Sequence, residues 1–567
     1  MKNALFFLFS ALAFSVNAQP GFVWAKQIGD TTNNYGNSVA VDANGNVYST
    51  GSFQGSVDFD HGPGTFFLTS AGAEDIFITK LDPLGNFVWA KKIGGKYSDV
   101  GNCIVIDANA NIYITGDFSS DTVDFDPGAG IYNTSGNGTY DIFILKLKAN
   151  GNFLWVKTIY GKNHDASICI TMDVYGSLYT AGWFSDTVDF DPGVGTYNLI
   201  SNSFDFDVFI LKLNSSGNFV WAKSMGGSSS DWCRSIAVDK HCNVYTTGVF
   251  MGTADFDPGP LVYNLYGYRD IFISKLDMSG NFVWAKAIGS GWNAAYSIAV
   301  DNAKGDVYFT GSFQDTVDFD PGNSVHNLIS TGYCDMFVCK LNSIGNLIWA
   351  KQIGGVGGAV SHGYYIMLDN QNNVYTTGFF SKTEDFDPGA GSYYLTANGS
   401  NDIFISVLDF SGNFVCAGAM GGSGPEFGLS IALDSNNNIH IAGSFYSKAD
   451  FDPGIGVFNL NTIGNWDAFI TKLSGCSLTV EIPELNEDNH DINISPNPSQ
   501  GIFTVNYKNK TSDAKICVYD LLGNCVLRNI TVKELNQRID LGDQPGGIYF
   551  VEILLGGEKT TRKIIIK

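Results

Sequence analysis

The stretch "TVDFDPGAG", Thr122–Gly130, contains a five-residue motif, DFDPG, that recurs along the chain. The motif begins at Asp124, Asp189, Asp255, Asp318, Asp385 and Asp450, and a variant with His61 in place of proline begins at Asp58. The second aspartates of successive copies are 63 to 67 residues apart. A nearly constant period predicts a repeat architecture in which each copy is one structural unit.

Each period contains four short segments of the types "FVWAK", "SIAVD", "NVYTTG" and "DIFISKL". All four are rich in β-branched or aromatic residues and are bounded by Gly, Asn or Asp, which is typical of strands. Turns such as "DANGN" (42–46) and "LGN" (84–86) suit tight antiparallel hairpins. Between residues 21 and 475 no segment has a helical apolar period, so we expect an all-β, seven-bladed propeller over residues 19–475.

The two ends of this region are complementary. The chain enters on an "FVWAK" strand that has no blade of its own, and it leaves on "DAFITKL", Asp467–Leu473. We expect the strand at Phe22–Gly29 to pair with Asp467–Leu473 and close the ring, which removes two exposed sheet edges.

The repeat as a whole, "GGSSSDW…SIAVD…NVYTTG…FDPG…DIFISKLDMSGN", resembles the seven-bladed β-propeller repeat of secreted bacterial proteins (SBBP-like). The resemblance covers residues 21 to about 475. It implies that the "IAVD" strands are innermost and the "FVWAK" strands outermost.

The start of the chain predicts export. Lys2, a short apolar run and the small residues before Gln19 read as a signal peptide over residues 1–18. No other apolar run is long enough to span a bilayer, so no transmembrane segment is expected after its removal. The net charge of −23 argues against a nucleic-acid partner.

The C-terminal part has a different texture. Residues 476–491 are predicted as an acidic linker, and alternating strands over 492–567 predict a small, Ig-like seven-stranded sandwich. The latter segment resembles the type A C-terminal sorting domain of type IX secretion cargo, through Pro496, Asn497, Pro498, Gly501, Gly523, Gly547, Tyr549, Lys563 and Lys567. This resemblance implies Sec export, the type IX machinery as partner, an extracellular or cell-surface location, and in many cases tethering to surface lipopolysaccharide.

The DFDPG motif has two interpretations. Residues i and i+2 of an extended chain share a face, so both carboxylates point one way and the phenylalanine anchors the turn from the other. The favoured interpretation is structural, with carboxylates accepting backbone N–H groups and glycine following at positive φ. The alternative is a Ca²⁺ site in each blade, helped by the aspartate that opens each "DIF" strand. Its ligands would be Asp58, Asp60, Asp124, Asp126, Asp189, Asp191, Asp255, Asp257, Asp318, Asp320, Asp385, Asp387, Asp450 and Asp452.

A second acidic set, Asp42 and its equivalents, ends the "SIAVD" strands, and we expect each to stabilise its own hairpin. Of the ten cysteines we expect most, including Cys416, to be small buried residues, and Cys517–Cys525 is the one plausible disulfide.

No catalytic motif is recognisable in the sequence, so we do not expect an enzyme. We expect a binding, adhesion or scaffold protein with a glycan or protein ligand, for which Trp232, Trp292 and Trp466 are candidate contacts. The alternative is a secreted hydrolase or lyase whose active site lies on one propeller face, where the loops vary between repeats.

Overall fold

The computed structural model describes residues 17–136, 139–202, 205–289, 291–479, 492–507, 515–520, 525–532, 534–555 and 558–566. Most of the predicted signal peptide, the predicted linker from residue 480, Gly523 and Lys567 lie outside these residues. The chain forms two compact units, Met1–Thr479 and Val480–Lys567. The described residues form strands and turns, which confirms the all-β prediction.

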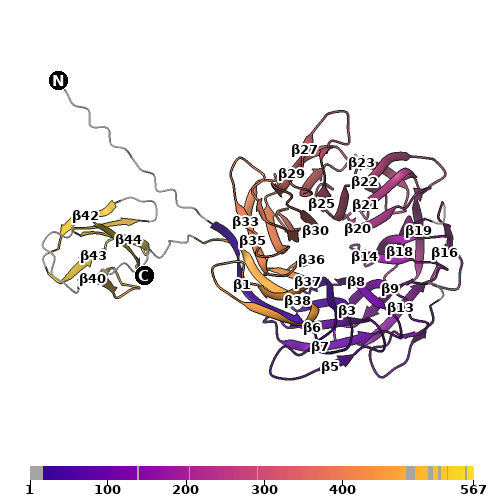
Figure 1. Cartoon of the computed structure of the whole chain (residues 1–567), viewed down its shortest axis with the longest axis horizontal. Coiled ribbons are helices and arrows are strands. Elements are labelled where there is room, and N and C mark those ends of the chain that lie inside the picture. The colour runs from indigo at the N-terminus through magenta and orange to yellow at the C-terminus, as the bar shows by residue number, and fades with distance from the viewer. Residues whose placement is uncertain are drawn as a thin grey trace. The chain divides into compact units, whose positions relative to one another are not determined.

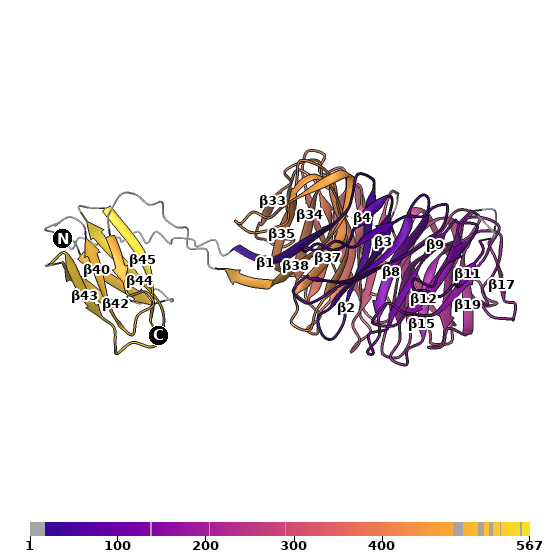
Figure 2. The same ribbon diagram turned by 90° about the horizontal axis from the view of Figure 1, so that it is seen from below.

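The first unit consists of seven antiparallel sheets of four strands each, called blades below, arranged around a central opening (Figures 1 and 2). From the inner to the outer strand, blades 1 to 4 are β2 (Asn34–Val41), β3 (Val47–Phe53), β6 (Asp75–Leu81) and β7 (Phe87–Ile93); β8 (Asp99–Ile106), β9 (Ile112–Phe118), β12 (Asp141–Leu147) and β13 (Phe153–Ile159); β14 (Ala166–Met172), β15 (Leu178–Phe184), β18 (Asp207–Leu213) and β19 (Phe219–Gly227); β20 (Trp232–Val238), β21 (Val244–Asp255), β22 (Asn264–Leu276) and β23 (Phe282–Ile288). Blades 5 to 7 are β24 (Ala294–Val300), β25 (Val307–Phe313), β28 (Asp335–Leu341) and β29 (Leu347–Gly355); β30 (Ser361–Leu368), β31 (Val374–Phe380), β34 (Asp402–Leu408) and β35 (Phe414–Gly422); β36 (Glu426–Leu433), β37 (Ile439–Asp450), β38 (Asn459–Thr479) and β1 (Asn17–Ile28).

The inner two strands of each blade are joined by the predicted turns. Gly45, for example, has φ 79° in the turn between β2 and β3, a conformation that glycine adopts without strain. The first strands of neighbouring blades contact one another, and β2 also contacts β36. The Ser38 hydroxyl accepts a hydrogen bond from the Ile104 N–H at 3.2 Å, and Ser430 accepts one from Val39 at 3.2 Å. These serines therefore join one inner strand to the next, including across the junction of blades 7 and 1.

Strand β1 supplies the outer position of blade 7. It pairs antiparallel with β38, with Phe22 opposite Leu473 and Ile28 opposite Ala468. In other blades an outer-strand indole donates to a turn of the next blade, as Trp284 Nε1 does to the Ser343 carbonyl at 3.1 Å. Trp24 of β1 is buried and makes the same contact with the Pro83 carbonyl of blade 1, at 3.4 Å.

The junction of blades 6 and 7 departs from this pattern. Cys416 stands at the tryptophan position of β35, and the chain leaves the ring after Leu473, so blade 7 has no turn to receive an indole. The structure joins Cys416 to Cys476 in a disulfide, with the Cα atoms 6.2 Å apart. The expectation that Cys416 is an unbridged apolar residue is therefore wrong, and Cys517 and Cys525 form no disulfide.

Each connection from the second to the third strand of a blade is longer than a simple loop. It forms a short two-stranded ribbon, or an extension of the blade strands themselves in blades 4 and 7, with the DFDPG motif at its tip. The separate ribbons are β4 (Ser56–Asp58) with β5 (Phe67–Thr69), β10 (Val123–Asp124) with β11 (Asn133–Thr134), β16 (Thr187–Asp189) with β17 (Asn198–Ile200), β26 (Thr316–Asp318) with β27 (Asn327–Ile329), and β32 (Thr383–Asp385) with β33 (Tyr394–Thr396).

The second unit contains seven strands in two sheets, as predicted. One sheet is β39 (Ile492–Ser495), β40 (Ile502–Tyr507) and β43 (Asn536–Asp540); the other is β42 (Cys525–Thr531), β41 (Lys515–Asp520), β44 (Gly547–Leu555) and β45 (Glu558–Ile566). Phe503, Val505, Ile516, Val518 and Val551 are among the residues of its apolar core.

Candidate functional site

The DFDPG turns are held together by their own carboxylates. In blade 2, Asp124 Oδ1 accepts hydrogen bonds from the N–H groups of Asp126 and Tyr132, at 3.1 and 2.8 Å. Asp126 Oδ1 accepts one from the Gly128 N–H at 2.8 Å. The same three bonds recur at every copy of the motif, including the variant that begins at Asp58. These contacts support the structural interpretation of the motif.

The glycines of these turns are needed for space. Gly128 does not have a positive φ, contrary to the expectation from its turn position. A Cβ atom at Gly128 would lie 2.9 Å from Asp126 Oδ1, and one at Gly130 would lie 2.1 Å from Asp126 Oδ2. The phenylalanine between the two aspartates is fully buried in all seven copies, where Phe125 packs 5.5 Å from Phe118 and 5.3 Å from Phe143 between ring centroids.

Calcium binding at these turns stays a prediction. Within the described ranges, no three or more His, Cys, Asp or Glu side chains gather in a way that could hold a metal ion. The aspartates that open the "DIF" strands do not complete such a set with the DFDPG carboxylates.

The aspartates that end the innermost strands stabilise their own hairpins, as expected. Asp42 Oδ1 accepts hydrogen bonds from the N–H groups of Asn44 and Asn46, both at 2.9 Å, and Asp42 Oδ2 accepts one from the Tyr48 hydroxyl at 3.1 Å. The Lys80 ammonium lies 4.9 Å from the centroid of the Tyr48 ring. The carboxylate is therefore used within its blade.

Pairs of acidic side chains are buried where neighbouring blades meet, a feature that the sequence analysis missed. Asp207 of blade 3 and Asp231 of blade 4 form one such pair. A Cβ atom at Gly226 would lie 2.5 Å from Asp207 Cγ, and the Gly227 N–H donates to Asp231 Oδ2 at 2.9 Å. The two glycines that end the outer strand therefore leave room for one carboxyl group and bind the other.

These paired acids have raised pKa values. Burial raises the pKa of Asp231 to about 7, with a further increase from the nearby Asp207, and burial raises the pKa of Asp207 to about 7 as well. Burial similarly raises the pKa of Glu426 to about 8, where Asp402 is its neighbour. Like charges in a dry junction oppose ionisation, so these groups hold protons near neutral pH.

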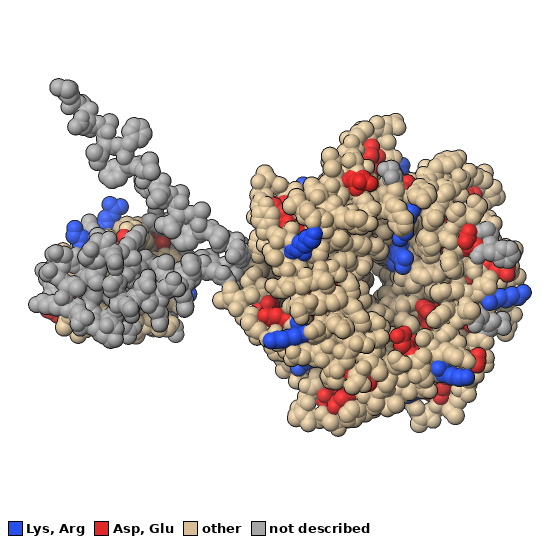
Figure 3. Space-filling view, viewed as in Figure 1, with Lys and Arg blue, Asp and Glu red and all other residues tan. Residues whose placement is uncertain are grey.

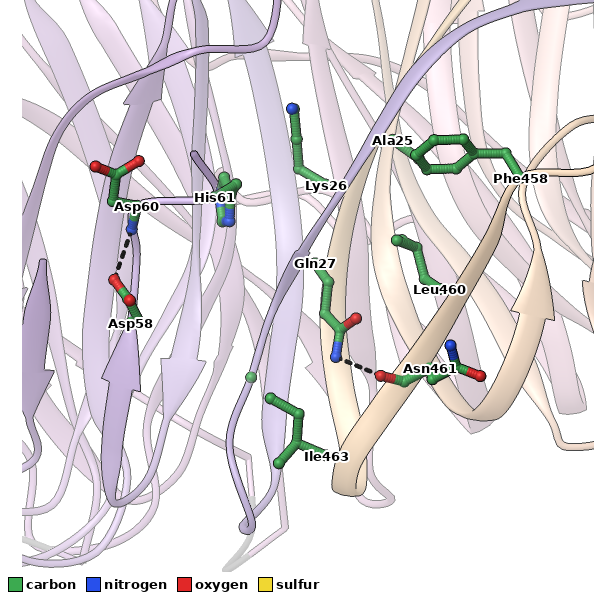
Figure 4. Close-up of a pocket in the computed structure, with 11 residues that line it drawn as sticks. Ala25, Lys26, Gln27, Asp58, Asp60, His61, Phe458, Leu460, Asn461 and Ile463 are labelled. Carbon is green, nitrogen blue, oxygen red and sulfur yellow. Dashed lines mark hydrogen bonds between the residues drawn. The ribbon is translucent and has the colours of Figure 1, made fainter. Parts of the chain in front are cut away.

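A pocket of about 490 Å³ lies between β1, β38 and the DFDPG variant of blade 1 (Figure 4). Gln27 Nε2 donates to the Asn461 carbonyl at 2.8 Å and to Asp467 Oδ2 at 2.6 Å. His61 lines the pocket, and its Nε2 is buried without a hydrogen-bond partner. Burial, together with the charge of Lys26, lowers the pKa of His61 to about 4.

This pocket marks a local difference in the ring. At five other junctions the end of an outer strand pairs with the next DFDPG motif: Gly94 with Asp124, Tyr160 with Asp189, Gly226 with Asp255, Gly354 with Asp385, and Gly421 with Asp450. Across the described residues no such pairing joins Gly29 to Asp58. Apolar walls with a few polar groups suit a small polar ligand, so this pocket is a secondary candidate site.

A row of aromatic side chains, called the aromatic arc below, follows the face at which the inner strands begin. Its members are Tyr35, Trp466, Phe427, Phe379, His362, Tyr364 and Tyr296, from blades 1, 7, 6 and 5. Consecutive ring centroids are 5 to 6.5 Å apart: Tyr35–Trp466 6.4 Å, Trp466–Phe427 5.5 Å, Phe427–Phe379 5.1 Å, Phe379–Tyr364 5.6 Å and Tyr364–Tyr296 5.2 Å.

Two arginines continue the arc towards blades 3 and 4. The Arg234 guanidinium lies 5.3 Å from the Trp183 ring centroid, and the Arg269 guanidinium lies 4.1 Å from that of Trp292. Burial raises the pKa of Tyr296, and the charges of Arg234 and Arg269 act against this increase. Basic and acidic side chains both appear near the central opening in Figure 3.

The arc occupies positions that differ between blades. The second residue of the inner strand, or its equivalent, is Tyr35, Val100, Ala166, Trp232, Ala294, His362 or Phe427. Of the three tryptophans expected at the surface, Trp292 is 57% exposed, whereas Trp232 and Trp466 are only partly exposed. Because no motif marks these positions, the sequence analysis found Trp466 but not its neighbours.

The described sorting-domain residues are held by the last strand or support it. Asn497 Oδ1 accepts a hydrogen bond from the Ile565 N–H, and Asn497 Nδ2 donates to the Lys563 carbonyl, both at 2.9 Å. Pro496 and Pro498 flank Asn497 and are exposed. The Gly501 carbonyl accepts from the Leu541 N–H at 2.7 Å, and Gly501 has φ 93°.

The sheet containing β44 and β45 carries the other described motif residues. Gly547 pairs with Ile566 at the start of β44, and Lys563 pairs with Phe550 and is exposed. Tyr549 is buried and donates its hydroxyl to the Pro545 carbonyl at 2.7 Å. The "SPNP" start and the C-terminal "KIIIK" of the motif set thus meet in one place.

Family comparisons agree with both resemblances. Residues 493–567 match the model of the secretion system C-terminal sorting domain, and residues 23–52 match that of a β-propeller repeat. The protein is thus a propeller-repeat protein with a type IX sorting domain, which indicates export and an extracellular or cell-surface location. Within the described part of the chain, no helix has the length and apolarity to cross a membrane.

Similar whole proteins are more distant. An uncharacterised WD repeat-containing protein of Acanthamoeba polyphaga mimivirus is 25% identical over 516 residues, covering 76% of this chain and 36% of that protein. The regulatory protein FlaEY of Caulobacter vibrioides is 27% identical over 130 residues, covering 23% of this chain and 13% of that protein. The chain therefore spans about a third or less of each relative. A chain of the mitotic checkpoint complex has a TM-score of 0.35 at 8% identity, covering 78% of this chain and 94% of that one.

Proposed function

We propose that this protein is an exported binding protein that holds a glycan on the face carrying the aromatic arc, for adhesion or scaffolding outside the cell. The observation that carries this proposal is the arc itself. Its rings are adjacent across four blades, and they occupy positions that vary while the framework of each blade repeats.

The chemistry of the arc suits a sugar ligand. Aromatic rings offer flat apolar surfaces to the C–H faces of sugar rings, and phenol, indole and guanidinium groups at their edges can bond to hydroxyls. The same combination occurs in protein interfaces, where tyrosine, tryptophan and arginine are enriched. A protein ligand is therefore the competing outcome of the binding experiment.

Repeated blades provide a rigid support for such a site. Asp42, Asp124 and their equivalents spend their carboxylates on main-chain bonds within the blades, which leaves the variable positions to determine what is bound. Binding on positioned loops and strand ends is the common use of a rigid scaffold. Tethering through surface lipopolysaccharide, implied by the sorting-domain type, would place this face at the cell surface.

The test is a glycan and matrix-polymer binding array with the mature protein, run with and without Ca²⁺. Trp466→Ala should reduce binding to the hits at least tenfold, because it removes a ring between Tyr35 and Phe427. Tyr175→Ala is the matched control, since Tyr175 is 76% exposed in the turn at the opposite end of an inner strand. Equal binding by Trp466→Ala and the wild type would contradict the proposal.

A turnover assay on each hit separates binding from the alternative of a hydrolase or lyase. Under the proposal, the bound polymer keeps its chain length during prolonged incubation. Release of new reducing ends, or of unsaturated sugar products, would identify an enzyme instead.

A further inference from the structure

Arg234 and Arg269 lie near each other on the face of the aromatic arc without an acidic partner. The described ion pairs include neither residue, and Arg234 Nε is buried with no hydrogen-bond partner. Burial lowers the pKa of Arg234, and the charge of Arg269 lowers it further. A buried guanidinium in a chain with 56 acidic residues would ordinarily pair with one of them.

Aromatic rings take the place of carboxylates around these two cations. Trp183 and Trp292 offer their ring faces at 5.3 and 4.1 Å, and Tyr296 lies within the field of both arginines. Cation–π contact stabilises a guanidinium only partly, and it leaves the in-plane N–H donors available. Donor groups of two arginines therefore remain for a ligand.

The backbone at Arg269 supports a specific role. Arg269 has φ 62°, the left-handed region that a long side chain adopts only at a cost. Its equivalents before the opening aspartates of the other blades are Glu74, Tyr140, Phe206, Cys334, Asn401 and Trp466, and none of these has a positive φ. Blade 4 thus accepts a strained conformation to present an arginine beside Trp292.

We propose that Arg234 and Arg269 bind the anionic group of an acidic sugar in the glycan held by the aromatic arc, a proposal that rests on the proposed glycan-binding function. A planar guanidinium fork matches a carboxylate or a sulfate through paired N–H donors. Low exposure of Arg234 strengthens this interaction, because a bound anion relieves the repulsion between the two cations. The sugar ring itself would contact Trp292 or Trp183.

The experiment measures the affinity of the mature protein for three defined polymers: polygalacturonate, which carries carboxylates; carrageenan, which carries sulfates; and a neutral glucan. The proposal predicts that the wild type binds at least one anionic polymer more tightly than the glucan. Arg234→Gln and Arg269→Gln should each weaken that binding at least tenfold while leaving any binding to the neutral glucan unchanged. The preferred anionic polymer identifies the source of the charge.

Two controls separate charge from folding. Lys148→Gln removes one positive charge from an exposed turn and should change binding less than twofold. Arg234→Lys keeps the charge without the fork, so it should recover only part of the affinity, and an unchanged melting temperature of Arg269→Gln excludes misfolding as the cause.

The outcomes distinguish the two proposals. Binding to the neutral glucan alone, sensitive to Trp466→Ala but not to the arginine variants, would overturn this inference and leave the proposed function standing. Binding to the anionic polymers that is unchanged in both arginine variants would also overturn it. A wild-type protein that binds none of the polymers would overturn the inference and count against the proposed function.

Discussion

Asp231→Asn tests the buried acid pairs at the blade junctions. Burial raises the pKa of Asp231 from 3.8 to about 7, so the folded protein keeps this proton up to near neutral pH while the unfolded chain loses it near pH 4. The folded state therefore binds more protons between these values, and its stability falls as the pH rises through them. Asparagine does not titrate, and Asn34 and Asn293 occupy the equivalent positions in blades 1 and 5.

The magnitude follows from proton linkage. For a group with these two pKa values, raising the pH from 5 to 8 lowers the free energy of unfolding by about 2–3 kcal/mol. At pH 5 we expect Asp231→Asn to cost about 1 kcal/mol, because Asp231 accepts N–H groups from Gly227 and Met251 and an amide has only one oxygen. At pH 8 the same substitution should stabilise the protein by roughly 1–2 kcal/mol, because it removes a buried charge.

The assay is urea unfolding at pH 5 and pH 8 in chelator, followed by tryptophan fluorescence. All ten tryptophans lie before residue 467, so the signal reports on the propeller and not on the sorting domain. Asp82→Asn serves as the control, because Asp82 is hydrogen-bonded in an exposed turn and its pKa is lowered by Asn86 and Leu84. An effect of Asp231→Asn that is the same at both pH values would refute the reasoning.

Three further predictions concern the turns and the two ends of the chain. Melting curves in Ca²⁺ and in chelator should superimpose, because the DFDPG carboxylates already accept main-chain N–H groups; a higher melting temperature in Ca²⁺ would support the metal interpretation, while Gly130→Ala should melt lower in both buffers because its Cβ would lie 2.1 Å from Asp126 Oδ2. A protein that starts at Asn37 should aggregate or melt markedly lower, because β38 loses its partner and the buried Trp24 alone contributes on the order of 2–3 kcal/mol; an unchanged melting temperature would count against the role of β1. Deleting residues 492–567 should leave a folded propeller in the periplasm, and cell fractionation that finds it outside the cell would contradict the sorting role of this segment.

The framework of the propeller was predictable because it is local and repeated. Segments such as "FVWAK" and "DIFISKL" have strand-forming residues at a fixed period, and Phe125 and its equivalents alternate with aspartates in a way that puts the rings inside. The unpaired strand at Phe22–Gly29 likewise has one obvious partner. These features depend on near neighbours in the sequence, so one sequence is enough to find them.

The features that the sequence did not reveal depend on contacts between blades. The Cys416–Cys476 disulfide replaces an indole-to-turn contact that exists only in the folded ring, and Cys476 reads as linker in the sequence. Asp207 and Asp231 come together across a junction, and each alone reads as a turn residue. The aromatic arc uses positions that carry a different residue in each blade, so no repeat pattern marks it.

The central claim is that the aromatic arc is the ligand-binding face, and hydroxyl-radical footprinting with and without a bound glycan tests it most directly. The account predicts protection from oxidation at the exposed or partly exposed rings Trp292, Trp466 and Tyr446, the last of which lies 5.7 Å from Trp466. Tyr175 and Tyr132, which are exposed elsewhere on the propeller, should be oxidised equally in both samples. Protection of Tyr175 or Tyr132 with none at Trp466 and Trp292 would contradict the account.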